Sequence, residues 1–164
     1  MALHSDAYYR GIADDAVRQA VIEEPPVPLE SLASRVGIPV RFVTLPSFFG
    51  GAIISEDGMP VALVNLARGE DERRRTLAHL LGHVLAVLAD PQSGYPRGTV
   101  REHREADIVA NELLLPEYLV RDQASKWFND HRYLARLFGV TEAEMTTRMR
   151  ELGIIKSRGV LWDY

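Results

Sequence analysis

The sequence predicts an α+β fold in which a small sheet of about three strands, antiparallel or mixed, packs on a helical half. Short β-rich runs bounded by glycine and proline occupy the stretch from about 40 to 65. Apolar residues then recur at helical spacing from Asp71 to about Leu88. With 164 residues, 46% of them apolar and 26% charged, the chain suits one compact domain spanning residues 1–164.

The first region, residues 1–38, is predicted to be helical. Residues 6–22 carry an approximate apolar stripe, and the prolines of "EEPPVPLE" end that helix because proline cannot continue it. Pro28 suits the first turn of a short second helix, which Gly37 closes.

The second region, residues 39–68, is predicted to form the sheet. Residues 40–45 alternate apolar and polar side chains, residues 51–57 follow a double-glycine break, and residues 61–65 form a β-rich run after the turn "EDGMP". We expect the last of these runs to be an edge strand.

An edge strand can hold an extended segment of a partner protein by strand addition. The candidate partner-binding residues are therefore Val61, Leu63 and Asn65.

The third region, residues 69–116, contains two predicted helices joined by the loop "ADPQSGYPRG". His79 and His83 lie four residues apart on the first helix, where residues i and i+4 sit nearly one above the other, ~6 Å along the axis. Their imidazoles can converge on one metal ion, and Zn²⁺ then needs a third protein ligand. Glu105, on the following helix, is the predicted third ligand, and small residues beside it permit close contact between the helices.

The fourth region, residues 117–164, is predicted to be helical. Thr141 and Glu144 form a capping box for a helix that Gly153 closes. Residues 131–153 have the length of a helix-turn-helix, which leaves open a DNA-associated role, although the second helix begins with acidic residues.

The segments "RRRTLAHLLGH" and "READIVANELLLP" closely resemble two motifs of the ImmA/IrrE family of metallopeptidases. Members typically carry R-x-x-F-T-x-A-H-E-L-G-H followed by E-A-N-x-F-A-x-x-L-L-M-P. The resemblance extends from roughly Pro28 to Ile155. The matching positions are Arg74 or Arg75, Thr76, Ala78, His79, Leu81, Gly82 and His83, then Glu105, Ala106, Ala110, Leu113, Leu114 and Pro116.

This resemblance implies a zincin-like fold with Zn²⁺ held by His79, His83 and Glu105. It also implies a role in phage, mobile-element or stress regulation. The characterised activity in that family is cleavage of a helix-turn-helix repressor, which is therefore the expected protein partner.

The chain departs from the family at Leu80, where members carry the glutamate that serves as general base. Leucine has no proton acceptor, and a general base typically contributes about 10²–10⁴-fold in rate. Glu112 is a candidate for a relocated base, although it lies ~10 Å along the helix axis from Glu105.

Three functions follow from these observations. The first is a metal-binding regulator with impaired proteolysis, a pseudoenzyme and anti-repressor in which the metal is chiefly structural. The second is an active zinc peptidase with an unconventional base. The third is a DNA-associated regulator acting through the C-terminal helices.

The composition indicates which partners the protein lacks and which compartment suits it. The net charge of −4 argues against nonspecific nucleic-acid binding, and no stretch approaches the ~20 apolar residues that a membrane span needs. The chain has no cysteine, which suits a reducing compartment. We expect a cytoplasmic protein that does not contact a membrane.

Overall fold

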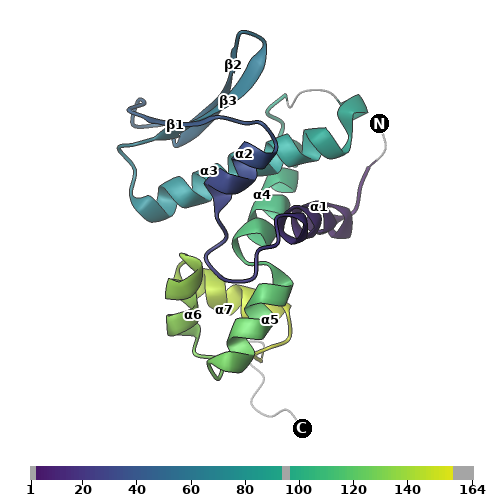
Figure 1. The fold of residues 1–164 in the computed structure, drawn as a ribbon, viewed down its shortest axis with the longest axis vertical. Coiled ribbons are helices and arrows are strands. Elements are labelled where there is room, and N and C mark those ends of the chain that lie inside the picture. Colours follow the sequence, from purple (N-terminus) through teal and green to yellow (C-terminus); the bar gives the residue numbers. More distant parts are fainter. Residues whose placement is uncertain (1–2, 94–96, 157–164) are drawn as a thin grey trace.

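Helices pack against one face of a small sheet and continue into a separate helical group below it (Figure 1). The computed structural model describes residues 3–93 and 97–156. In chain order the elements are α1 (Asp6–Gln19), α2 (Leu29–Arg35), β1 (Val40–Val43), β2 (Gly51–Glu56), β3 (Met59–Asn65), α3 (Glu70–Ala89), the 3-10 turn η1 (Pro91–Ser93), α4 (Val100–Leu114), α5 (Glu117–Lys126), α6 (His131–Phe138) and α7 (Glu142–Glu151). The predicted α+β fold with a three-stranded sheet is confirmed.

The strand order is β1-β3-β2, with β3 parallel to β1 and antiparallel to β2. The prediction that residues 61–65 form an edge is therefore wrong, because β3 is paired on both sides. Asn65 supplies a physical reason: its buried side chain accepts the N–H of Leu45 and donates to the carbonyl of Phe49. These bonds hold the segment that connects β1 to β2 against the end of β3. As a result, β3 lies between the other two strands.

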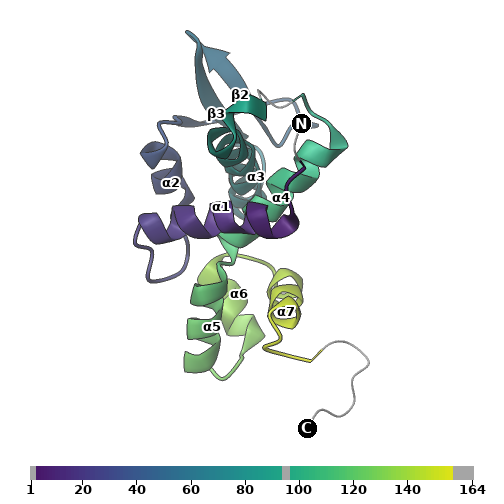
Figure 2. The ribbon, with the colours of Figure 1, turned by 90° about the vertical axis from the view of Figure 1, so that its right-hand side faces the viewer.

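The core lies between the sheet and α3, where Ala62 and Val64 are buried with the apolar face of the helix. Helix α1 crosses α3 and α4 on the side away from the sheet (Figure 2). Helices α3 and α4 approach very closely, since a Cβ on Gly82 would lie 2.4 Å from the carbonyl oxygen of Ala106. Glycine at this point, with alanine opposite, sets how near the two helices come.

Helices α5, α6 and α7 gather below the other elements in both views (Figures 1 and 2). Thr141 and Glu144 form the predicted capping box at the start of α7. The buried Arg148 joins this helical group to α4, because it pairs with Glu112 and donates from Nε to the carbonyl oxygen of Leu115 at 3.0 Å. Throughout the described ranges, every helix is too short or too polar to cross a bilayer.

Candidate metal centre

Helix α3 carries two histidines on the side that faces α4. The residues that pack into the core, among them Leu77 and Leu81, occupy the other buried face of this helix. His83 is 8% exposed, and His79, one turn earlier, is partly exposed. The i, i+4 spacing thus places both imidazoles at one point on the helix surface.

Helix α4 contributes a third histidine, His103, from its first turn. Thr99 caps the helix and accepts the N–H of Glu102, whose carboxylate in turn accepts the N–H groups of Arg97 and Gly98. This capping box fixes where the helix begins and so fixes the turn that bears His103.

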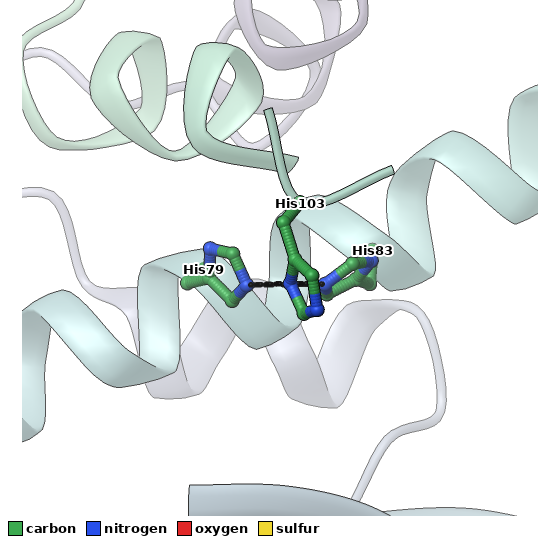
Figure 3. Close-up of side chains that lie close together, drawn as sticks. All are labelled: His79, His83 and His103. Atoms are coloured by element: carbon green, nitrogen blue, oxygen red, sulfur yellow. Dashed lines mark hydrogen bonds between the residues drawn. The ribbon is translucent and has the colours of Figure 1, made fainter. Parts of the chain in front are cut away.

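The three imidazoles point one nitrogen each toward a common centre (Figure 3). The Nε2 atoms of His79 and His83 lie 3.1 Å apart, and the Nδ1 atom of His103 lies 3.2 Å from the first and 3.3 Å from the second. Nitrogens bound to one tetrahedral Zn²⁺ are about 3.3 Å apart, given Zn–N bonds of about 2.0–2.1 Å. The three separations therefore fit the edges of a metal-ligand tetrahedron.

The protonation state of His83 also suits a metal. Burial, reinforced by the neighbouring His79 and His103, lowers the pKa of His83 to about 4, so its ring is neutral near pH 7. The Nδ1 atom of His79 lies 2.7 Å from a carboxylate oxygen of Asp107. Three imidazoles that share one centre can hold a metal ion, since a metal uses the lone pairs that hydrogen bonds among three rings cannot all employ.

The position next to the first histidine is filled by hydrocarbon, as the sequence predicts. Leu80 is 7% exposed and lines the same cleft as the histidines. Strand β2 runs close by, because a Cβ on Gly51 would lie 3.3 Å from Cδ1 of Leu80. No proton acceptor stands at this position.

Glu105, the predicted third ligand, lies outside the histidine group. Its carboxylate accepts from Nε of Arg101 at 2.9 Å. Burial, reinforced by Glu105, raises the pKa of Tyr9 on α1 to about 12. Residues two apart on a helix are about 200° apart around its axis, so Glu105 and His103 face opposite sides of α4. The structure thus brings His79 and His83 together with His103 and not with Glu105.

One signal in the sequence points to His103. The small residues Ala106 and Ala110 form the stripe of α4 that lies against α3, and His103 precedes Ala106 by three residues on that stripe. These alanines not only let the helices come together but also set the rotation of α4 that turns His103 toward α3.

Glu112 also lies away from the histidines. It lines a polar cleft between α1, α4, α5 and α7 and not the cleft that contains the histidines. Its carboxylate pairs with Arg148 and accepts the N–H of Glu117. Burial raises its pKa although Arg148 acts in the opposite direction. These contacts link Glu112 to α5 and α7, so its carboxylate has a structural role.

The fold and the site together define a class of protein. A small sheet beside a helix that bears H-x-x-x-H, with a further histidine from the next helix, is a zincin-like, metallopeptidase-type domain. The family model Peptidase_M78, described as the IrrE N-terminal-like domain, matches residues 33–150, and this chain belongs to that family. The predicted family membership is confirmed.

A solved structure supports the fold. A Mycobacterium tuberculosis transcriptional regulator superposes with a TM-score of 0.65 at 18% sequence identity. The match covers 88% of this chain and 46% of that one, so this chain spans less than half of the similar protein. No curated protein matches the sequence significantly.

Proposed function

We propose that this protein is a metal-binding regulator that keeps the metallopeptidase fold while its proteolysis is impaired. The observation that carries the proposal is the juxtaposition of three convergent histidine nitrogens with Leu80, which occupies the general-base position. His79, His83 and His103 would hold the metal, and Zn²⁺ is an ion that suits three imidazoles at these separations.

The residues around this site support binding more than hydrolysis. When bound, Zn²⁺ acidifies water and polarises a carbonyl group. Among the described residues, Glu72 and Asp107 are the carboxylates that line the cleft. Glu72 accepts from Arg68, and Asp107 contacts His79, so both are engaged elsewhere. Proton removal from an attacking water therefore lacks its usual acceptor.

We further propose that the partner is a protein segment held in extended form along β2. The N–H of Asn65 donates to the carbonyl of Gly50. In an antiparallel pair every second residue makes the backbone hydrogen bonds, so in this register Ala52 and Ile54 bond to β3. The backbone groups of Gly51, Ile53 and Ser55 then point toward the β2 edge of the sheet, which no other described strand pairs with. This edge replaces the one predicted on residues 61–65.

The cleft beside this edge favours an apolar segment. It has a volume of about 1130 Å³, and its walls are largely apolar. Ile53 and Met59 from the β2–β3 hairpin face Leu80, Val84 and Leu88 from α3 across it. Burial of apolar side chains between these walls would supply the main binding free energy.

The partner that we favour is a helix-turn-helix repressor, bound in the cytoplasm as the target of an anti-repressor. The similar structure is described as a transcriptional regulator, which supports a regulatory role. Direct DNA binding through α6 and α7 is less well supported. Helix α7 begins with Glu142 and Glu144, and Arg148 is buried in a pair with Glu112.

The test compares wild type with Leu80→Glu and the matched control Leu80→Gln, which adds a polar side chain without a basic carboxylate. Each Zn²⁺-loaded protein is incubated with the repressor encoded beside its gene, and cleavage and binding are both measured. We expect all three to bind the repressor and only Leu80→Glu to cleave it. Cleavage by wild type as fast as by Leu80→Glu would refute the impairment.

A further inference from the structure

Asp107 contacts the back of a metal-binding ring. Its Oδ1 atom lies 2.7 Å from Nδ1 of His79, whereas the Nε2 atom of the same ring faces His83 and His103. Asp107 follows His103 by four residues on α4, so the same face of this helix carries both. Helix α4 thus presents one histidine to the common centre and one carboxylate to a histidine of α3.

This contact determines where the proton of His79 resides. A carboxylate only accepts hydrogen bonds, so the ring atom that it contacts must donate. In the neutral ring the proton then sits on Nδ1, and Nε2 keeps the lone pair that a metal requires. The other tautomer would place a hydrogen between three nitrogens that lie 3.1–3.3 Å apart.

We propose that Asp107 is a positioning residue for metal binding, which holds His79 in the Nδ1–H tautomer with Nε2 directed at His83 and His103. The proposal rests on the metal site of the proposed function. Carboxylate partners of this kind orient a histidine ligand and raise its basicity. The Asp107 side chain is 64% exposed, so its removal leaves the core intact and the variants are expected to fold.

The first experiment uses metal-free protein, so that it does not depend on whether the protein binds zinc. Long-range ¹H–¹⁵N NMR identifies the protonated nitrogen of His79 in wild type, Asp107→Asn and Asp107→Ala. We expect the Nδ1–H form in wild type and in Asp107→Asn, whose amide oxygen still accepts, and a mixture in Asp107→Ala. An Nε2–H ring in wild type, or an unchanged ring in Asp107→Ala, would overturn the proposal.

The second experiment measures the dissociation constant for Zn²⁺ by competition with a chromophoric chelator. We expect Asp107→Ala to bind Zn²⁺ about 10–100-fold more weakly and Asp107→Asn to lose clearly less. The matched control is Asp15→Ala, which removes an exposed aspartate of α1 and should leave the constant unchanged. Equal losses in Asp107→Asn and Asp107→Ala would indicate direct ligation and refute the positioning role.

If every protein, wild type included, fails to bind Zn²⁺, the proposed metal site is wrong. The NMR result on the metal-free ring then still decides whether Asp107 orients His79. The two failures are therefore distinguishable.

Discussion

Gly82 of α3 packs directly against Ala106 of α4. A Cβ on Gly82 would lie only 2.4 Å from the carbonyl oxygen of Ala106. This contact sits one turn from His79 and His103 in their respective helices. It therefore controls both the packing of the two helices and the distance between the histidines that they carry.

Gly82→Ala is expected to push α3 and α4 apart. Overpacking of this kind costs about 1–3 kcal/mol in the free energy of unfolding, and the displaced His103 would weaken Zn²⁺ binding. Urea denaturation and chelator competition measure the two effects. The matched control is Gly11→Ala in α1, where a Cβ meets nothing within 4 Å. That substitution should stabilise the protein by about 0.5–1 kcal/mol through helix propensity. Equal behaviour of the two variants would contradict this account.

Metal removal should distinguish His103 from Glu105 as the third ligand. Zn²⁺ at 100 times its dissociation constant stabilises the folded protein by about 2.7 kcal/mol, so a chelator lowers the melting temperature of wild type. We expect His103→Ala to lose this chelator-sensitive stabilisation and Glu105→Gln to retain it. Calorimetry with and without EDTA makes the comparison. The opposite pattern would restore Glu105, as the sequence predicts, to the ligand set.

The stability of metal-free protein should depend on pH through His83. Its pKa falls from 6.5 in the unfolded chain to about 4 in the folded protein. Between these values the unfolded chain binds more protons, so stability increases as pH rises from about 4 to about 6.5 and then levels off. Over this range the difference in unfolding free energy between wild type and His83→Gln should change by up to about 3 kcal/mol.

Denaturant titrations in EDTA across this range provide the measurement. Glu112 also titrates abnormally, because burial raises its pKa. It is present in both proteins, and the comparison with His83→Gln therefore cancels its contribution. A difference that does not vary with pH would show that His83 is not buried as a neutral ring.

The buried pair of Glu112 and Arg148 should couple the C-terminal helices to α4. Arg148→Met leaves a carboxylate buried without its partner and is expected to cost about 3–5 kcal/mol. The double variant Glu112→Leu/Arg148→Met removes both charges and should recover most of that loss. Lys126→Met is the control, because its pair with Asp122 is exposed and lies within α5, so its loss should change stability little. A double variant as unstable as Arg148→Met would contradict this account.

Most of the local structure could be predicted from the sequence. Helix α3, the capping box of Thr141 and Glu144, and the convergence of His79 with His83 all depend on residues within four positions of each other. Leu80 beside these histidines follows from the same local geometry. A helix sets the relation between such neighbours whatever surrounds it.

The strand order was mispredicted because pairing joins residues far apart in sequence. Hairpin patterns identify β2 and β3 but do not say on which side of them β1 will lie. Asn65 decides this through contacts with the connection from β1 to β2, at Leu45 and Phe49, which lie 20 and 16 residues earlier in the chain. The apolar residues beside Asn65 in β3 do not indicate that Asn65 makes these contacts.

By itself, then, the sequence determined the helices, the family and two of the three histidines at the common centre. These depend on the regular geometry of a helix, which the spacing of residues in the sequence reveals. The tertiary structure decided that His103 and Asp107 face α3 while Glu105 faces α1. The rotation of α4 about its axis is set by the contact of Ala106 with Gly82, a fit between surfaces that are far apart in the chain.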